Sequence, residues 1–384
     1  MTNLAPPRSA FGAPPQGGAA SGPAKPDPRR PLGLPAWTVV LAALIVVTVL
    51  APLLNLAVPA DSAFHLSDYA VGLVGKIMCY AICALAMDLI WGYTGILSLG
   101  HGLFFALGGY AFGMYLMRAI GADGQYRSAL PDFMVFLNWQ ALPWHWTFSD
   151  SFAFQLAMVV LVPGLLALVF GWFAFRSRIK GVYFSIITQA LTFAAMLLFF
   201  RNETGFGGNN GFTDFKRILG VPLATPSMRM TLFVLTGLTL IGCYVFARWL
   251  VASKFGRVLQ AIRDAETRVM FTGYDPVRYK LTIWVISAVM CAVAGALYVP
   301  QVGIINPSEM SPAAGIEMAI WAAVGGRGTL IGPIVGAFFV NGAKSWFTVA
   351  FPEFWFYFLG ALFIAVTLFL PQGLIGLLRR LKAP

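Results

Sequence analysis

The first residues that could contact a polar solute lie in a glycine-rich apolar stretch, Leu97–Tyr110, with the sequence LSLGHGLFFALGGY. An ionisable side chain in an apolar run of membrane-spanning length usually faces a cavity or a polar partner. His101 could therefore hydrogen-bond a solute or tie two helices together, and the sequence leaves both interpretations open. Glycines in such a run let helices pack closely or interrupt a helix so that its backbone meets a substrate. The residues of this stretch that could line a path for a solute are Ser98, Gly100, His101 and Gly102.

A second stretch, Glu317–Gly336, combines a carboxylate with several glycines and a proline in the sequence EMAIWAAVGGRGTLIGPIVG. Glu317 and Arg327 would lie about 15 Å apart on one helix, so we expect no ion pair between them, and we place Arg327 in a turn. Two interrupted apolar regions in opposite halves of a chain indicate a binding site near the membrane midplane, although no residue-level repeat joins the halves. Glu317, Gly325 and Gly326 are therefore further candidates for the pathway.

A third stretch, residues 251–280, is the longest segment between apolar runs on the side where Lys and Arg residues gather. It predicts a short amphipathic helix, because apolar residues recur on one face, and Gly273 followed by Pro276 is a helix stop signal. Its polar face carries both signs of charge, which favours a protein partner over a membrane surface. The apolar face comprises Val258, Ile262, Ala265 and Val269. The candidate coupling residues are Gly256, Ile262, Arg263, Asp264, Glu266 and Gly273.

No residue pattern typical of catalysis is present. The chain lacks a G-x-x-x-x-G-K-[ST] phosphate loop, and its one Gly-Lys pair, Gly75-Lys76, lies in an apolar run. Neither G-x-S-x-G nor H-E-x-x-H occurs. The four cysteines also lie in apolar runs without metal or disulfide spacing, so we interpret them as small buried side chains. We expect no enzyme activity, no catalytic residue, no metal and no cofactor.

Composition places these stretches in a membrane protein. Of 384 residues, 59% are hydrophobic and 11% are charged, whereas about 25% are charged in a typical soluble domain. The net charge of +11 lies in short segments between apolar runs, which is the positive-inside pattern. Nucleic-acid binding is not supported, because no basic patch with interleaved aromatics lies on a polar segment.

The apolar runs predict an all-α polytopic membrane protein with about ten transmembrane segments, some glycine-broken or re-entrant. Residues 1–35 are predicted to be a disordered cytoplasmic tail and residues 36–378 the transmembrane domain. Most Lys and Arg residues then fall on one side, with both termini cytoplasmic in a bacterial-type inner membrane. Residues 118–153 and 201–229 become external loops, and 251–280 a cytoplasmic one. The segments are 36–58, 69–91, 95–117, 154–175, 182–200, 230–250, 281–300, 310–324, 329–350 and 354–374.

Two charged residues in the second segment are interpreted as structural. Lys76 lies near the outer end, where its side chain can snorkel to the interface. Asp88 lies near the inner end, where it could cap the turn Gly92-Tyr93-Thr94. Few ionisable residues lie at mid-span, which suits a neutral polar solute and disfavours an ion-coupled carrier.

Four ordered motifs give a family resemblance over residues 85–377: LSLGHGLFFALGGY, RIKGVYFSIITQA, the 256–280 loop with RYKLTIWVISAVMCAVAGALY, and GGRGTLIGPIVGA. They resemble the permease family of branched-chain amino acid ABC importers. The loop motifs LPDFMVFL, LPWHW and GFGGNNGFTDF look most like its urea-importer members. The resemblance implies a second homologous permease, two cytoplasmic ATP-binding subunits and an external solute-binding protein as partners, with 256–273 as the segment that seats in an ATPase.

The resulting hypothesis is an ATP-driven importer subunit that moves a small polar solute, urea, inward by alternating access. A branched-chain amino acid is the alternative solute within the same family. The rival classes are an ATP-independent channel or secondary transporter, which would transport without ATPase subunits, and a membrane enzyme or scaffold, which would retain a bound cofactor.

Overall fold

The computed structural model describes residues 34–59, 61–62, 64–179, 181–369 and 373–376. The tail expected at residues 1–35 lies outside this part of the chain, except for its last two residues, which begin the first helix. Six helices are long and apolar enough to cross a bilayer. They are α1 (Leu34–Leu56), α2 (Asp68–Thr94), α5 (Phe152–Arg176), α6 (Val182–Phe199), α7 (Pro226–Ala252) and α9 (Pro276–Val302).

The other four expected segments also form helices, which are shorter or less apolar: α3 (His101–Arg118), α10 (Pro312–Gly325), α11 (Ile331–Ala350) and α12 (Trp355–Phe369). The all-α polytopic fold is therefore confirmed. The third segment begins later than expected, since α2 ends in the left-handed Gly95 and no helix forms before His101. The short α10 is preceded by strand β4 (Ile304–Ile305) and the 3-10 helix η5 (Pro307–Met310), in which Ile305, Pro307 and Met310 are buried.

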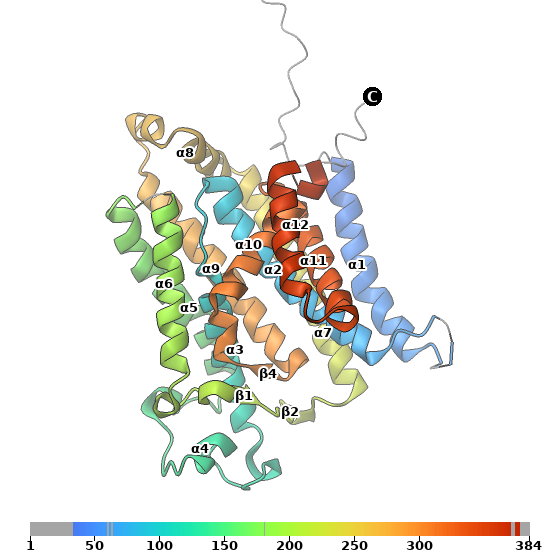
Figure 1. Ribbon diagram of the computed structural model, residues 1–384. Helices are drawn as coiled ribbons and strands as arrows, with labels where there is room; N and C mark the ends of the chain where they lie inside the picture. Colours follow the sequence, from blue (N-terminus) through green and yellow to red (C-terminus); the bar gives the residue numbers. More distant parts are fainter. Residues whose placement is uncertain (1–33, 60, 63, 180, 370–372, 377–384) are drawn as a thin grey trace, which may run out of the picture.

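The bundle has two distinct ends (Figure 1). One end holds α8 (Lys254–Phe271), the start of α1 and residues 373–376. The opposite end holds α4 (Asp132–Phe136) and the strands β1 (Phe212–Thr213), β2 (Arg217–Ile218) and β3 (Val221–Pro222). Short 3-10 helices lie in the connecting loops: η1 (Gly121–Asp123), η2 (Trp144–Trp146), η3 (Asn202–Thr204) and η4 (Gly208–Asn210).

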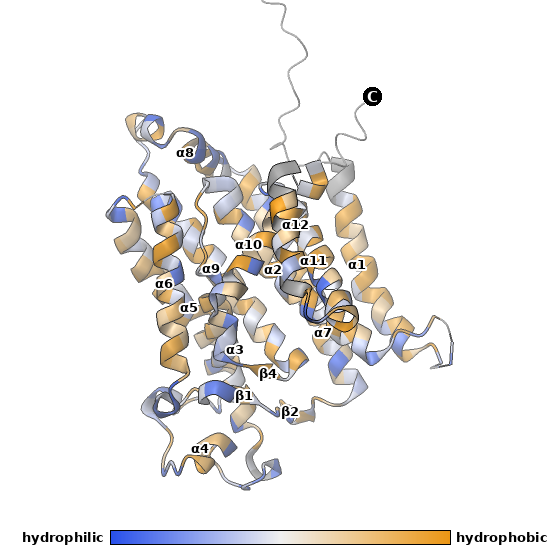
Figure 2. Ribbon diagram, viewed as in Figure 1, coloured by the Kyte–Doolittle hydropathy of each residue, from blue (hydrophilic) through white to orange (hydrophobic). Residues whose placement is uncertain are grey.

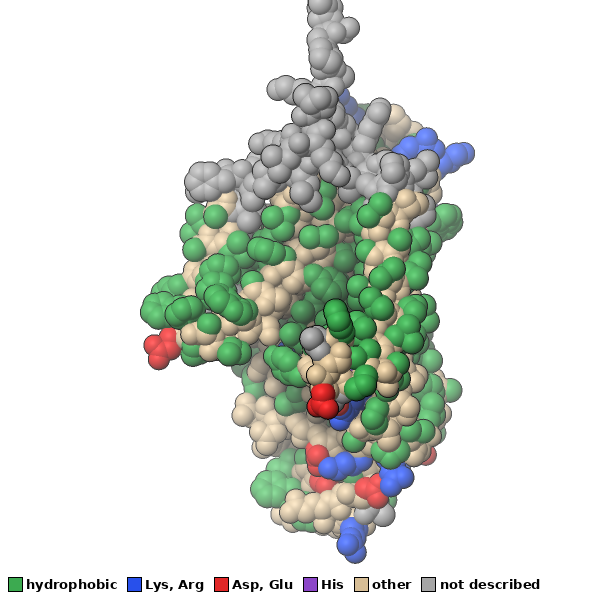
Figure 3. All heavy atoms as spheres, turned by 90° about the vertical axis from the view of Figure 1, so that its right-hand side faces the viewer, with side chains coloured by type: hydrophobic (Ala, Val, Ile, Leu, Met, Phe, Trp, Pro, Cys, Tyr) green, Lys and Arg blue, Asp and Glu red, His purple; other side chains and the backbone are tan. Residues whose placement is uncertain are grey.

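Apolar side chains cover the middle of the bundle, and polar ones gather toward its ends (Figures 2 and 3). The most apolar windows of α2 and α9 are each 67% buried, whereas that of α1 is 17% buried and that of α5 is 22% buried. A helix that is apolar on all sides must be buried or face lipid. Thus α2 and α9 form the core, and α1 and α5 offer apolar surface to lipid.

Two antiparallel strand pairs tie the loops of the α4 end together. Strand β1 pairs with β4, with Phe212 opposite Ile305 and Thr213 opposite Ile304, and β2 pairs with β3. The close approach requires Gly211, whose φ is +64° and where a Cβ would overlap the carbonyl oxygen of Ile305. The loop before α7 is thereby fastened to the chain that leads into η5.

Candidate functional site

Three cavities follow one another along α2 from the α4 end toward the centre of the bundle. The outer cavity, of about 450 Å³, reaches from Asp68 to Gly72 on α2. The middle cavity, of about 440 Å³, reaches from Tyr69 to Tyr80, and the inner cavity, of about 300 Å³, includes Lys76 and Tyr80. Neighbouring cavities share lining residues, so they form one series. Because a helix rises 1.5 Å per residue, the series extends roughly 18 Å into the bundle.

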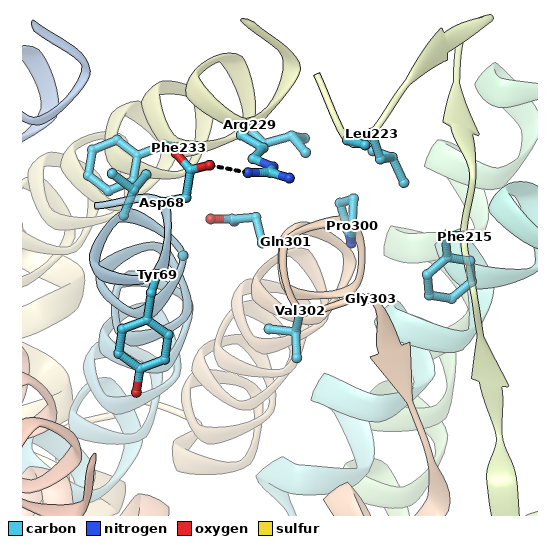
Figure 4. Close-up of a pocket in the computed structure, with 14 residues that line it drawn as sticks. Asp68, Tyr69, Phe215, Leu223, Arg229, Phe233, Pro300, Gln301, Val302 and Gly303 are labelled. Carbon is cyan, nitrogen blue, oxygen red and sulfur yellow. Dashed lines mark hydrogen bonds and ion pairs between the residues drawn. The ribbon is translucent and has the colours of Figure 1, made fainter. Parts of the chain in front are cut away.

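An ion pair lies among the residues that line the outer cavity (Figure 4). Arg229 of α7 donates from Nη1 to Oδ2 of Asp68 at 2.5 Å. Gln301 of α9 lies beside this pair and is held by bonds from its Nε2 to Thr236 Oγ1 at 2.7 Å and to the Leu297 carbonyl at 2.9 Å. The ends of α2, α7 and α9 thus each contribute a polar side chain to this cavity.

The inner cavity is lined by two cations and two carboxylates. Lys344 of α11 donates from Nζ to both carboxylate oxygens of Glu317 on α10, at 2.7 and 2.8 Å. Lys76 lies over the rings of Tyr80 and Tyr298, with its Nζ 5.7 and 5.9 Å from their centroids. The hydroxyl of Tyr298 donates to Oε1 of Glu309 at 3.2 Å. The cavity is therefore charged but balanced, as intramembrane charges usually are.

Of these four ionisable residues, only Glu317 is predicted by the sequence to lie on the pathway. Lys76 was expected to snorkel to the interface, but its ammonium group faces aromatic rings and the cavity. Glu309 and Lys344 were not among the candidates. The sequence does show each of these charged residues in or beside an apolar run. It does not show that they meet in one cavity, because this depends on how α2, α10 and α11 pack. The scarcity of mid-span charge expected from the sequence is therefore wrong for this part of the bundle.

The candidates around His101 form a packing contact. His101 is buried, its Nε2 lies 2.7 Å from Ser287 Oγ of α9, and its ring packs edge-on against Trp284 at 5.4 Å. The hydroxyl of Ser98 accepts from the Gly100 amide at 3.1 Å, just before α3. A Cβ at Gly102 would lie 2.7 Å from the carbonyl oxygen of Glu309. None of these four residues lines the three cavities, but Gly102 lets α3 approach the backbone that presents Glu309.

Gly325 and Gly326 lie at the turn between α10 and α11. A Cβ at Gly325 would overlap the carbonyl oxygen of Gly332, so this glycine permits the close crossing of the two helices. The turn is bound by Asp88, which is buried and accepts from the amides of Gly328 at 2.5 Å and Leu330 at 3.1 Å. Asp88 thus has the structural role expected from the sequence, but the expected turn was wrong: it binds the chain just before α11, where a helix N-terminus attracts negative charge, and not the turn at Gly92.

The predicted amphipathic helix of the 251–280 segment is α8, which is kinked at Ala265 (φ −158°, ψ 72°). Its buried residues are Gly256, Leu259, Ile262 and Val269. Val258 and Ala265, assigned to the apolar face from the sequence, are only partly buried. Gly273 has a φ of +86° and follows the helix end, as its stop signal predicts.

Two charged residues of α8, Arg263 and Glu266, contact the bundle, whereas Lys254, Arg257 and Arg268 are exposed. Arg263 donates from Nη1 to the carbonyl of Gly92 at 2.6 Å and pairs with Asp264 at 3.1 Å. Glu266 pairs with the buried Lys280 of α9 at 2.7 Å. The exposed apolar side chains lie instead at the end of α8 and just beyond it, where Phe271 is 93% exposed. Arg263 and Glu266 thus hold α8 on the bundle, and its C-terminal end projects.

The chain is similar to several permease proteins of transport systems. The chain is 25% identical over 339 residues to the high-affinity branched-chain amino acid transport system permease protein LivM of Salmonella typhimurium, covering 82% of this chain and 72% of that protein. It is 22% identical to LivH of the same organism over 305 residues (77% and 91%). It is 25% identical to BraD of Pseudomonas aeruginosa over 304 residues (77% and 91%). No solved structure matches the chain.

A family of transport components also matches most of the chain, from residue 69 to residue 367, which includes α8 and, apart from Asp68, all residues that line the three cavities. The relatives are permease proteins, in agreement with the expectation that this chain is not an enzyme. The chain belongs to the family described as branched-chain amino acid transport system / permease component.

Proposed function

We propose that this chain is a permease subunit of an ATP-driven importer and that its solute passes through the outer, middle and inner cavities. The observation that carries the proposal is the series of adjoining cavities, each lined by both polar and apolar side chains, between helices of the matched family region. Such a path offers hydrogen-bonding groups to a polar solute where lipid-facing helices would offer none. Its mouth at the α4 end would then face the exterior, and α8 and both termini the cytoplasm.

Urea is the solute that this lining supports best. The inner cavity is bordered mainly by hydroxyl, amide, aromatic and charged groups, with Ala313, Ala314 and Met318 as its apolar residues. A compact neutral amide needs only the hydrogen-bonding groups of this lining, whereas a branched aliphatic side chain would also have to bury itself against the apolar ones. A branched-chain amino acid is the second candidate, because the relatives carry that description and because paired cations and carboxylates suit a zwitterion.

The partners follow from the same proposal. LivM and LivH of one organism are named as permease proteins of a transport system, and this chain is similar to both, which supports pairing with a second homologous permease. Two cytoplasmic ATP-binding subunits would seat the projecting end of α8, where Met270, Phe271 and Tyr274 are exposed. An external solute-binding protein would dock on the 118–153 and 201–229 loops.

Movement of α8 would reach the cavities through two contacts. Arg263 connects α8 to the C-terminal end of α2, and Asp88 connects α2 to the start of α11. Because α2 carries Lys76 and α11 carries Lys344, displacement of α8 would alter the spacing of cavity charges. In this proposal Arg263 and Glu266 transmit movement of the ATP-binding subunits to the bundle through contacts within this chain.

The test is uptake into proteoliposomes that contain the complete complex with ATP, with labelled urea and labelled leucine measured in parallel. ATP-dependent accumulation of urea with little leucine uptake is the expected result, and the reverse selectivity would establish the second candidate. Uptake by this chain alone, without ATP-binding subunits, would instead identify a channel or carrier and overturn the proposal.

A further inference from the structure

We infer that Trp321 and Glu309 form a solute-binding subsite in the inner cavity, in which the indole N–H donates to an acceptor oxygen of the solute and Glu309 accepts from its N–H groups. This inference rests on the proposed function, because it assigns recognition within the same pathway. Both residues line the inner cavity. Trp321 comes from α10 and Glu309 from the 3-10 helix η5 that precedes it, so the subsite lies between these two elements.

The indole of Trp321 is unusual among the buried tryptophans. Its side chain is 2% exposed, and its Nε1 has no hydrogen-bond partner within the described ranges. The two other buried tryptophans donate to backbone carbonyls: Trp284 to Ala167 at 3.0 Å and Trp146 to Gly205 at 3.0 Å. A buried N–H without a partner is unfavourable. An acceptor on a bound solute would remove that penalty.

Packing holds the indole in place. The centroid of its ring lies 4.8 Å from the centroid of the Tyr80 ring, with an interplanar angle of 31°. Tyr80 in turn packs against Tyr298, with ring centroids 5.6 Å apart. A donor fixed by neighbouring rings loses little freedom when it binds, which is the general advantage of a preorganised site. Trp321 is therefore suited to recognise one oxygen in one position.

Glu309 offers the complementary group. Tyr298 is the only residue of the described chain that donates a hydrogen bond to Glu309, at Oε1, so Oε2 remains for a ligand. Glu317, one helical turn before Trp321, binds Lys344 through both of its oxygens. Glu309 is thus the carboxylate of the inner cavity with an open acceptor, and Lys76 supplies the balancing positive charge.

The ligand class follows from these groups. It is a small molecule that carries a carbonyl or carboxylate oxygen together with N–H donors and that fits a cavity of about 300 Å³. A neutral amide such as urea and a zwitterionic amino acid both satisfy this description. They differ in what they need from Glu309: a neutral amide needs a hydrogen-bond acceptor, whereas an ammonium group also needs the negative charge.

The experiment measures KM and maximal rate of ATP-dependent uptake by the complete complex in proteoliposomes. Trp321→Phe keeps an aromatic ring beside Tyr80 but removes the N–H, and we expect KM to rise about tenfold, the loss of one hydrogen bond, with the maximal rate changed less than twofold. Trp284→Phe is the matched control, because it removes a buried indole N–H outside the cavity, and its KM should stay within about twofold of the parent.

Glu309→Gln separates the two ligand sources, since glutamine keeps an acceptor without the charge. A neutral amide solute should then show a KM change of a few-fold, and an amino acid a loss of uptake. Replacement of Trp321 by benzothienylalanine, which exchanges the N–H for sulfur at similar shape, provides the measurement if Trp321→Phe fails to assemble. An unchanged KM in the benzothienylalanine variant, with uptake intact, would overturn the subsite. Absence of ATP-dependent uptake by the parent complex would instead overturn the proposed function.

Discussion

The guanidinium of Arg263 donates a 2.6 Å hydrogen bond from Nη1 to the main-chain carbonyl of Gly92. This bond joins α8 to the last turn of α2, where free carbonyls attract positive charge. One turn earlier on α2, Asp88 holds the start of α11. Thus α8 and the start of α11 are both bound to the last two turns of α2.

Replacement of Arg263 is expected to uncouple the importer. Arg263→Ala removes the bond to Gly92 but leaves the projecting end of α8 intact, so ATP hydrolysis should persist while solute uptake falls. Arg263→Lys should restore uptake only in part, because an ammonium lacks the planar fork of a guanidinium. The measurement is ATPase activity and uptake in the same proteoliposomes. Arg268→Ala, an exposed arginine of the same helix, is the control, and equal losses in both variants would contradict a specific role for Arg263.

Replacement of Asp88 is expected to destabilise the α10–α11 turn. Asp88→Ala leaves the amides of Gly328 and Leu330 buried without an acceptor, at a cost of roughly 1–3 kcal/mol for each. Asp88→Asn keeps one acceptor oxygen and should cost less. The thermal unfolding midpoint of the purified chain in detergent reports the difference. Asp264→Ala removes a half-exposed carboxylate and should shift the midpoint little, so a larger shift there would argue against the capping role of Asp88.

The Glu317–Lys344 pair is expected to behave as a unit. Glu317→Gln leaves an excess positive charge in the inner cavity, and Lys344→Gln an excess negative one, so each should reduce uptake by about tenfold or more. The exchange Glu317→Lys with Lys344→Glu restores neutrality and should recover part of the uptake. A double variant that is no better than its singles would show that position, and not charge balance, matters.

The part of the 118–153 loop that contains His145 is expected to become less stable at low pH. Burial lowers the pKa of His145 below its ordinary value of 6.5, and its ring stacks on Phe206 with centroids 5.7 Å apart. The folded loop therefore favours the neutral imidazole, so its stability is complete above pH 6.5 and declines as the pH falls toward the lowered pKa. Hydrogen exchange of residues 141–149 at pH 7.5 and pH 5.5 should show faster exchange at the lower pH, after correction for the intrinsic rate. His145→Gln should abolish the difference, and a difference that persists would assign the effect to another group.

Helix positions could be predicted from the sequence because apolar runs of sufficient length have few alternatives in lipid. Each of the ten runs coincides with a helix. The stop signal at Gly273 was likewise local and is confirmed by its left-handed backbone. Local signals were sufficient where the relevant neighbours are close in sequence.

The site was harder to predict because its contacts join residues far apart in the chain. Asp88 binds amides more than two hundred residues away. A prediction that considered only its sequence neighbours therefore assigned it to the wrong turn. Arg263 and Glu266 were expected at a partner surface, since a mixed-charge helix face is usually exposed, but their partners are Gly92 and Lys280. For the first motif the sequence left helix packing and helix interruption open, and for the second it predicted a broken helix. In the structure Gly102 and Gly325 are sites of close approach, to groups that the sequence could not name.

The pairing of β1 with β4 has a consequence for how this region can vary. The two strands, Phe212–Thr213 and Ile304–Ile305, are paired through their main chains, and four residues beyond Ile305 the chain reaches Glu309. Main-chain bonds are indifferent to side-chain identity, apart from proline, which lacks the N–H. Side-chain identity can therefore vary at the partly buried Thr213 and Ile304, but less at Phe212 and Ile305, whose side chains are buried in the core. A homologue that keeps these two positions apolar would preserve the connection between its outer loop and the carboxylate.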